Sequence, residues 1–349
     1  MADLPSFDEL YAATHRGRTP FPWQARLARQ VATDGWPTEI GVPTGLGKTA
    51  CIDIAVWALA CQAAERRPEE RTAATRTWYV VNRRLLVDSA FEHGEALSRW
   101  LRDPSSLLRD WPDAGPDHVA TLEAVAVALQ RAAGLRSEHG PLHVTRLRGG
   151  ADLGVRPPEP SQPALVFATV PMFASRWLFR GYGSSTSMRP VDAALAGIDS
   201  LVLLDEAHLA RPLARLAAPL AACDAGDPTC LLPPERARPH FVALTATGEA
   251  HGDRFDLDGD DLAHPEIRKR LHAAKPTTVR TTPKKKLAAA PAGAAREVLA
   301  GSAAPTSCVV FANTPQTARA VFDLLGREVG GEAELHLLTG RMREREART

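Results

Sequence analysis

The segment Val42-Pro43-Thr44-Gly45-Leu46-Gly47-Lys48-Thr49 decides the fold class that the sequence predicts. It lies between a short apolar run at 39–43 and a helical pattern that continues to about residue 64. A phosphate-binding loop requires this position between a strand and a helix. The strict pattern has glycine where Val42 stands, whereas here Gly41 comes one place earlier. A glycine turn before a core helix is therefore the alternative interpretation.

The same loop supplies the groups that a nucleotide needs. Its glycines let backbone N–H groups turn toward phosphate oxygens, and the helix that follows directs its positive end at the anion. We expect Lys48 to lie exposed in the loop and to reach the β- and γ-phosphates of ATP, and Thr49 to place its hydroxyl on Mg²⁺. The predicted nucleotide-binding residues of the loop are Thr44, Gly45, Leu46, Gly47, Lys48 and Thr49.

A second feature, Asp205-Glu206-Ala207-His208, ends the apolar run at 201–204. An apolar strand that delivers two carboxylates at its carboxyl end suits a metal–nucleotide site. We expect Asp205 to hold Mg²⁺, directly or through water, and Glu206 to orient and polarise the attacking water. Together with Lys48 these are the predicted catalytic residues. The alternative is a strand followed by an acidic helix cap.

Two further segments are expected to complete the site. Thr245-Ala246-Thr247 follows an apolar run at 241–244, and the hydroxyls of Thr245 and Thr247 could couple His208 to the γ-phosphate end of the site. Upstream, Gln24 follows Phe21-Pro22-Trp23, and its amide can read adenine because it offers both donors and an acceptor. The alternatives are a plain strand exit and a helix start with a buried aromatic residue.

Composition limits the class of protein. The 349 residues suggest two domains, or one and part of another, at about 150 residues per domain. With 44% hydrophobic and 24% charged residues a mostly disordered chain is disfavoured, and the net charge of +1 gives no support for a nucleic-acid partner without excluding a local basic face. The five cysteines form no C-x-x-C pair, which favours a reducing compartment. Without a visible signal peptide or spanning segment, we expect a cytoplasmic protein with no membrane partner.

Apolar runs alternate with helical patterns along most of the chain. This alternation predicts an α/β fold with a parallel sheet and helices on both faces. We expect an ATP-binding, RecA-like P-loop domain over 1–248 and a linker-like connection over 249–306, with a small helix near 265–274. A strand at 307–311, a helix at 315–329 and a strand at 334–338 would then begin a second RecA-like domain over 307–349, which is incomplete.

The order of Gln24, the loop, the Asp205–His208 segment and the Thr245–Thr247 segment resembles the first RecA-like domain of superfamily 2 DEAH-box helicases. In helicases the loop tolerates a small residue in place of the first glycine. Further segments are similar to the CRISPR-associated helicase–nuclease of type I systems, in the I-U or I-G variant whose helicase begins at the N-terminus. These segments are Val81-Asn82-Arg83-Arg84, Leu147-Arg148-Gly149-Gly150, 175–183 and 338–343.

This resemblance implies an ATP-dependent helicase of antiviral defence. Such a protein translocates 3′→5′ on single-stranded DNA, is recruited by a crRNA-guided surveillance complex and is coupled to a metal-dependent HD nuclease. The chain contains no His-Asp dipeptide and stops before the arginine pair of the second domain. We therefore expect an N-terminal fragment, whose missing half and HD nuclease a separate polypeptide could carry. Another DEAH-type translocase subunit, from restriction or repair, and an ATP- and DNA-binding remnant without turnover remain as alternatives.

The resemblance also places DNA contacts on loops that leave the strands. The residues concerned are Asn82, Arg83, Arg148, Gly149, Gly150 and Arg176. Contacts of this kind hold the phosphate backbone without reading the base sequence. The alternative is that the arginines are solvated or pair with nearby carboxylates.

Overall fold

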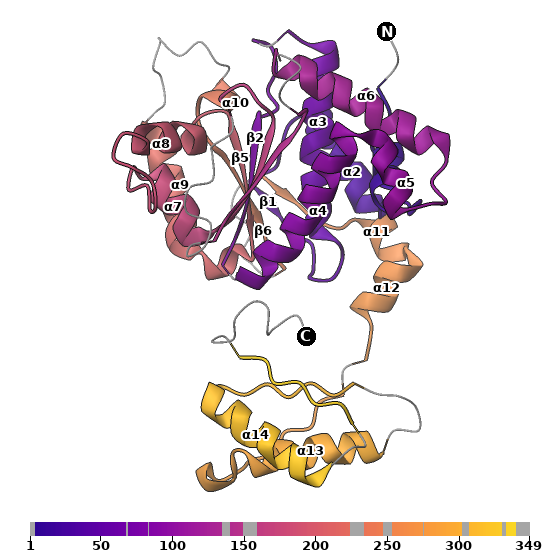
Figure 1. The fold of residues 1–349 in the computed structure, drawn as a ribbon, viewed down its shortest axis with the longest axis vertical. Helices are drawn as coiled ribbons and strands as arrows, with labels where there is room; N and C mark the ends of the chain where they lie inside the picture. The colour runs from indigo at the N-terminus through magenta and orange to yellow at the C-terminus, as the bar shows by residue number, and fades with distance from the viewer. Residues whose placement is uncertain are drawn as a thin grey trace. The chain divides into compact units, whose positions relative to one another are not determined.

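The protein divides into two units, Met1–Ala273 and Ala274–Thr349. The computed structural model describes residues 4–67, 69–82, 84–134, 140–148, 159–223, 234–246, 253–274, 276–301, 307–329 and 333–339. The first unit is built on a seven-stranded parallel sheet with helices on both faces, so the predicted α/β class is confirmed (Figure 1).

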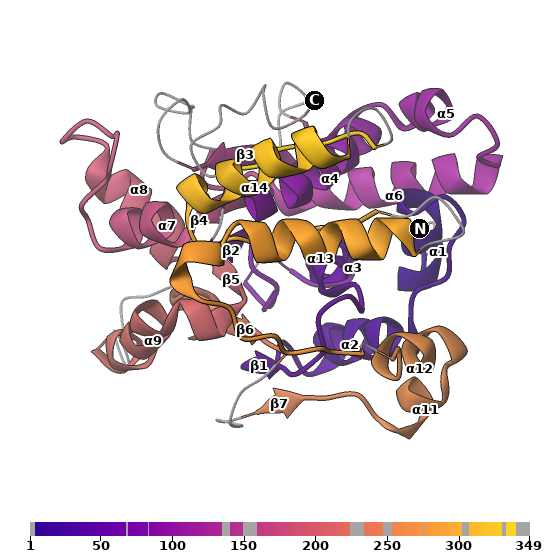
Figure 2. The ribbon, with the colours of Figure 1, turned by 90° about the horizontal axis from the view of Figure 1, so that it is seen from below.

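The strands pair in the order β3-β4-β2-β5-β6-β1-β7, with β3 and β7 at the two margins (Figure 2). Every pairing is parallel, so the carboxyl ends of all strands meet at one edge of the sheet. Along the chain the strands are β1 (Glu39–Ile40), β2 (Arg76–Val81), β3 (His143–Leu147), β4 (Ala164–Thr169), β5 (Ser200–Asp205), β6 (His240–Leu244) and β7 (Arg254–Phe255).

The register aligns the two predicted halves of the site. Ile40 of β1 pairs with Leu244 of β6, and Leu244 pairs in turn with Asp205 of β5. The predicted phosphate loop and the Asp205–His208 segment therefore leave the sheet from the same row, two strands apart. At the usual strand spacing this separation is roughly 10 Å. The Thr245–Thr247 segment begins between them, at the end of β6.

The helices of the first unit form two layers, one on each face of the sheet. On one face, α3 (Cys51–Glu65) packs under α1, α2, α4 and α6, and nearly all residues from Cys51 to Ala60 are buried, as expected for a central helix. The others on this face are α1 (Phe7–Thr14), α2 (Pro22–Thr33), α4 (Arg84–Arg102), α5 (Leu107–Asp110) and α6 (Pro116–Ala132). The opposite face carries α7 (Val170–Trp177), α8 (Arg189–Gly197) and α9 (Arg211–Cys223).

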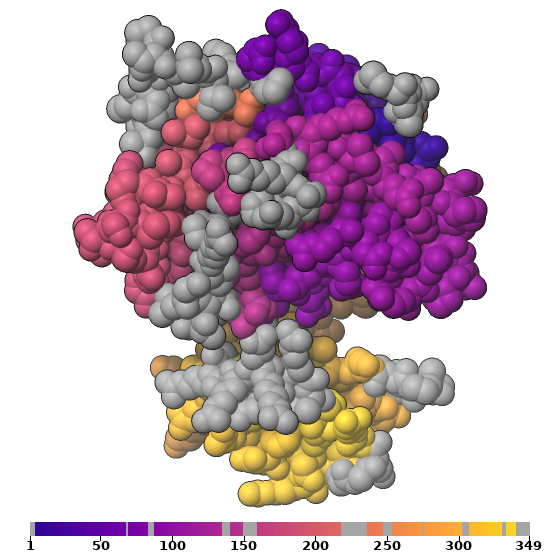
Figure 3. Space-filling model, turned by 45° about the horizontal axis from the view of Figure 1, so that its top comes forward, coloured from indigo at the N-terminus to yellow at the C-terminus, as the bar shows by residue number. Residues whose placement is uncertain are grey.

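The sheet residues alternate between two hydrophobic cores. Tyr79 and Phe167 face the core under α3, whereas Trp78 and Val166 belong to the core beneath α7. This period of two is the physical reason why buried β-strands can be read from apolar runs. The space-filling view shows the segment of α7 to α9 on the left flank of this unit and that of α5 and α6 on the right (Figure 3).

The first unit extends beyond residue 248, where the sequence placed its end. β7 adds to the sheet beside β1, and Arg254 pairs with Glu39 at 2.8 Å. Arg26 of α2 binds the α11 segment through Asp258 at 2.8 Å and Asp261 at 2.6 Å. The short elements here are α10 (Pro234–Ala237), α11 (Gly259–Ala263) and α12 (Pro265–Leu271). A two-residue strand gives little periodicity, which is why the sequence suggested a linker.

The second unit contains a small helical core. It consists of α13 (Ala289–Ala300) and α14 (Pro315–Glu328), joined through a cluster of Ala292, Ala295, Val321, Leu325 and Val329. The helix predicted at 315–329 is confirmed. The predicted strands at 307–311 and 334–338 are not, because these segments make no ladder among the residues that the structure describes. None of the described helices is long and apolar enough to cross a membrane.

Candidate functional site

The loop between β1 and α3 turns sharply at two glycines. Gly45 and Gly47 have φ angles of 86° and 79°, in the left-handed region that favours glycine. A Cβ on Gly47 would also lie 2.8 Å from Nε2 of Gln24. Gly41 has a different role, since a Cβ there would lie 2.2 Å from Asp256 and 2.4 Å from Arg254. The early glycine thus makes room for β7, and Val42 is buried in the core.

Three side chains, two from α2 and one from α12, donate hydrogen bonds to the carbonyl groups of this loop. The Arg270 guanidinium donates to the Gly45 carbonyl oxygen at 2.5 Å, and the Trp23 indole donates to that of Leu46 at 3.2 Å. Gln24 donates through Nε2 to the Gly47 carbonyl oxygen at 2.9 Å. Three consecutive carbonyl groups are therefore occupied by the protein itself.

The amide groups of the loop, in contrast, are open. No oxygen of the described residues accepts a hydrogen bond from the backbone N–H groups of residues 44–49. Backbone amides are obligatory hydrogen-bond donors, and a run of them at the start of a helix is an anion-binding arrangement. The loop thus has the donor set that phosphate oxygens require.

Lys48 is buried, and the expectation that it lies exposed is wrong. Its relative exposure is 7%, and its Nζ atom has no hydrogen-bond partner among the described residues. The residue lies in the 3-10 turn Lys48–Ala50 that precedes α3. A buried ammonium without a partner costs several kcal/mol, so this group needs an anion beside it.

Gln24 is fully buried and is engaged at both ends of its amide. Its Oε1 accepts the Phe21 N–H at 2.7 Å, and its Nε2 donates to the loop. It therefore links the start of α2 to Gly47. An adenine would have to use the second N–H and the second lone pair of this amide. Its role in reading the base stays a prediction.

Asp205 lies at the end of β5 and is held by two donors. The Tyr79 hydroxyl donates to Oδ2 at 2.6 Å, and the Glu206 N–H donates to Oδ1 at 2.9 Å. Burial and the Asp205 carboxylate hold the pKa of Tyr79 well above its usual range, while the Thr49 hydroxyl acts on it in the opposite direction. One phenol thus connects the two residues predicted to bind Mg²⁺, Thr49 and Asp205.

The pKa of the Cys51 thiol is affected by residues from both predicted halves of the site. Burial raises its pKa, the Asp205 carboxylate adds to this effect, and Lys48 opposes it. Both predicted halves of the site therefore act on one buried atom at the start of α3. Sequence reasoning missed Tyr79 and Arg270. The strand period could have indicated Tyr79, but Arg270 follows the loop by 225 residues and carries no sequence signal.

Glu206 adopts an unusual backbone conformation. Its φ of 50° and ψ of 47° lie in the left-handed region, which costs of order 1 kcal/mol or more for a residue with a Cβ. Its carboxylate lies 3.4 Å from Nδ1 of His208. Strain of this kind clusters at functional sites, and here it turns the chain directly after Asp205.

The predicted coupling residues are only partly described. Thr245 is buried at the end of β6, where its N–H donates to the Ile40 carbonyl oxygen at 3.1 Å. Thr247 lies outside the described residues. The observed partner of His208 is Glu206, so a relay from His208 through the threonines stays a prediction.

Three of the predicted DNA-contact residues lie in the described part of the chain. Asn82 is exposed at the carboxyl end of β2. Arg148 binds both oxygens of Asp88 at 2.9 and 2.8 Å. Arg176 is largely buried, with Nε 4.0 Å from Asp192. Arg83, Gly149 and Gly150 lie outside the described residues. Both described arginines therefore face a carboxylate, the alternative that the sequence left open.

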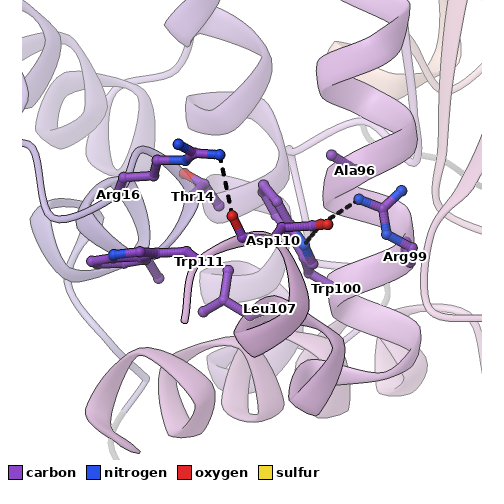
Figure 4. A pocket seen from close by; sticks show the side chains of 9 residues that line it. Thr14, Arg16, Ala96, Arg99, Trp100, Leu107, Asp110 and Trp111 are labelled. Carbon is purple, nitrogen blue, oxygen red and sulfur yellow. Dashed lines mark hydrogen bonds and ion pairs between the residues drawn. The ribbon is translucent and has the colours of Figure 1, made fainter. Parts of the chain in front are cut away.

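A separate cavity of about 260 Å³ lies between α1, α4 and α5 (Figure 4). Asp110 accepts from Arg99 at 2.5 Å and from the Trp100 indole at 2.8 Å, and Arg16 donates to the Asp110 carbonyl oxygen at 3.1 Å. Its polar groups thus bind one another. None of the predicted site residues lines this cavity.

Comparison with protein-family models and with curated proteins found no match to this chain. The assignment of the site consequently depends on its geometry. That geometry comprises the open loop amides, a buried lysine whose Nζ has no partner in the described part of the chain, and a carboxylate at the end of β5, two strands away.

Proposed function

We propose that the first unit binds ATP with Mg²⁺ and hydrolyses it, as part of a single-stranded DNA translocase or helicase of CRISPR interference. The observation that carries the ATP assignment is Lys48, a buried ammonium beside six loop amides, none of which has a partner among the residues that the structure describes. Together these groups offer one concentrated positive field. A polyphosphate is the ligand class that satisfies all of them at once.

The other site residues would divide the chemistry between them. Thr49 and Asp205 would hold Mg²⁺, and the connection of both to Tyr79 supports this pairing. Bound Mg²⁺ would neutralise charge on the phosphate oxygens. Glu206, which lies beside His208, would accept hydrogen bonds from the attacking water and orient it.

Translocation on DNA and the CRISPR context are the finer part of the proposal. They are supported by the resemblance of the Asn82, Arg148 and 175–183 segments, and Asn82 is exposed at the same sheet edge as the nucleotide site. Another DEAH-type translocase subunit remains the second candidate. A gene cluster of CRISPR proteins beside the coding sequence would distinguish the two.

The nucleotide assignment is tested by calorimetric titration of Lys48→Ala with Mg-ATP. We expect affinity to fall about 10- to 100-fold, because a hydrogen bond to a charged group contributes roughly 1.5–3 kcal/mol. Lys285→Ala removes an exposed lysine and is the matched control. Equal affinity in both variants would refute the loop assignment.

Hydrolysis and DNA dependence are measured separately, with and without single-stranded DNA. Turnover that Glu206→Gln abolishes would support an ATPase. Tight Mg-ATP binding without any turnover would instead identify a non-hydrolysing remnant. Fluorescence anisotropy with labelled single-stranded DNA then tests whether the same chain binds the predicted substrate.

A further inference from the structure

A cluster of three metal-ligating side chains lies outside the nucleotide site. It consists of His15 directly after α1, Asp53 in the first turn of α3 and His93 in α4. These three helices lie on the same face of the sheet (Figure 1). The residues are far apart in the sequence, so the fold itself brings them together.

The geometry points to a shared centre. His15 Nε2 lies 3.3 Å from Oδ2 of Asp53, and His93 Nε2 lies 2.9 Å from Oδ1. One ligand atom from each residue lies within 4.8 Å of the other two. Ligand atoms on one tetrahedral zinc ion are separated by roughly 3.4 Å, given bonds of about 2.0–2.2 Å. The two imidazoles contact different oxygens of Asp53, and both contacts are hydrogen bonds in the metal-free chain. An ion would therefore replace the protons between these groups, and the ligand atoms would shift by about 1 Å to surround it.

The imidazole rings are held in orientation by stacking. The ring of Tyr11 stacks on His15 with centroids 4.0 Å apart, and His15 stacks on His93 with centroids 5.1 Å apart and planes at 24°. A ligand set whose rings are fixed in advance loses less side-chain entropy when an ion binds. The stack therefore limits the rotation of the two imidazole rings before an ion binds.

Burial and access also suit an ion. The Asp53 side chain has no exposed surface, whereas those of His15 and His93 are 27% and 19% exposed. A fully buried carboxylate is costly unless cations or donors surround it. In the metal-free chain His15 and His93 are the partners of this carboxylate, and both keep part of their surface exposed.

We propose that His15, Asp53 and His93 bind one divalent transition-metal ion of the zinc class. Two imidazoles and a carboxylate form the ligand set that such ions prefer, whereas Mg²⁺ and Ca²⁺ prefer oxygen ligands alone. The ion joins α1 and α4 to the helix that begins at the phosphate loop. It is independent of the Mg²⁺ that the nucleotide site would hold.

The test uses the full chain after treatment with a chelator, titrated with Zn²⁺ and followed by calorimetry and thermal melting. We expect one ion per chain and a higher melting temperature, since a ligand that binds only the folded state stabilises it. In His15→Asn and His93→Gln, Zn²⁺ affinity should fall by at least about tenfold. His272→Asn changes an exposed histidine after α12 and should bind as the parent does.

Two outcomes would overturn the proposal. One is equal Zn²⁺ affinity in His15→Asn, His93→Gln and the His272→Asn control. The other is an X-ray absorption spectrum of the zinc-loaded chain with sulfur among the ligands, which would assign binding to cysteines such as the exposed Cys308. His15 is partly exposed, so circular dichroism of the metal-free His15→Asn variant should match the parent. If the two circular dichroism spectra differ, the X-ray absorption spectrum of the zinc-loaded parent chain decides instead.

Discussion

Lys48 combines two properties that reduce the stability of the free protein. Its ammonium is buried, and no described group accepts its protons. Proteins tolerate such a cost mainly where a ligand removes it. The burial of Lys48 is therefore stronger support for an anionic ligand than the loop pattern is. An exposed lysine would have been equally consistent with a plain glycine turn.

This argument predicts opposite effects of one substitution. Lys48→Met keeps the volume and removes the charge, so the melting temperature of the nucleotide-free protein should rise by a few degrees. Mg-ATP should raise the melting temperature of the parent but not of the variant. Lys285→Met serves as the control and should change neither value. A variant less stable than the parent without nucleotide would show that Lys48 is paired in the free protein.

The two carboxylates after β5 are predicted to separate in function. Glu206→Gln should retain Mg-ATP affinity and lose hydrolysis by about 100-fold or more, because an amide cannot act as a base toward water. Asp205→Asn keeps an acceptor for the Tyr79 hydroxyl but loses the charge, so Mg²⁺-dependent binding should weaken. Titrations at several Mg²⁺ concentrations, with single-turnover hydrolysis, compare them. Identical binding curves for both variants would contradict the division of roles.

At the scale of elements, apolar runs predicted the central strands closely. The apolar run at 241–244 lies within β6, which begins one residue earlier, and the run at 201–204 lies within β5, which is one residue longer at each end. Apolar runs locate such strands because both faces of the sheet are covered. β7 and α11 were missed, since their stability comes from partners such as Glu39 and Arg26 that are distant in sequence.

The candidate site shows the same division. Spacing alone predicted the loop and the Asp205–Glu206 pair as site residues, because that prediction depends on local order. It could not reveal that Lys48 is buried, that Tyr79 contacts Asp205 or that Arg270 holds Gly45. It also could not show that Arg148 is bound to Asp88. These facts depend on tertiary contacts, which a local pattern does not contain.

The opposite edge of the sheet is stabilised by a buried ionic group. Asp199, before β5, accepts from Arg236 at 2.8 Å through each oxygen and from the Thr75 N–H at 2.9 Å. Burial alone would raise the pKa of Asp199, but the hydrogen bonds from Arg236 and Thr75 outweigh it and hold the value at about 2. The structural carboxylate thus lies at the amino edge, away from the nucleotide site.

This lowered pKa predicts a pH dependence of stability. The contribution of Asp199 is complete above its unfolded pKa of about 3.9 and is lost as pH falls toward about 2. Asp199→Asn should reduce the free energy of unfolding at neutral pH by about 3–5 kcal/mol, since Arg236 would stay buried without its counter-ion. Urea unfolding between pH 2.5 and 7 measures both effects. Asp113→Asn, on the surface, is the control, and an equal loss in both variants would contradict the prediction.

At the scale of the whole molecule, the described candidate site belongs to the first unit alone. The loop, Asp205, Glu206 and the residues that hold the loop all precede Ala273. The second unit contributes a small core around Ala292 and Leu325. ATP binding should therefore be a property of the first unit, provided that the unit includes β7 and α12.

Two shortened chains test this boundary. A chain that ends at Ala273 keeps Arg270 and β7, so it should bind Mg-ATP as the full chain does, within about twofold. A chain that ends at Gly248 loses the guanidinium that holds the Gly45 carbonyl, the strand beside β1 and both ion-pair partners of Arg26. It should bind at least about tenfold more weakly, because a removed charged hydrogen bond alone costs roughly 1.5–3 kcal/mol.

The same pair of chains separates loop positioning from general instability. Arg270→Ala in the chain that ends at Ala273 removes one hydrogen bond and leaves β7 in place, so its melting temperature should stay near that of its parent while Mg-ATP affinity falls. Arg268→Ala, on the same helix and exposed, is its matched control. Equal affinity in the chains that end at Ala273 and Gly248 would mean that the 249–273 segment does not support the loop. The nucleotide-binding unit would then end where the sequence first placed it, at residue 248.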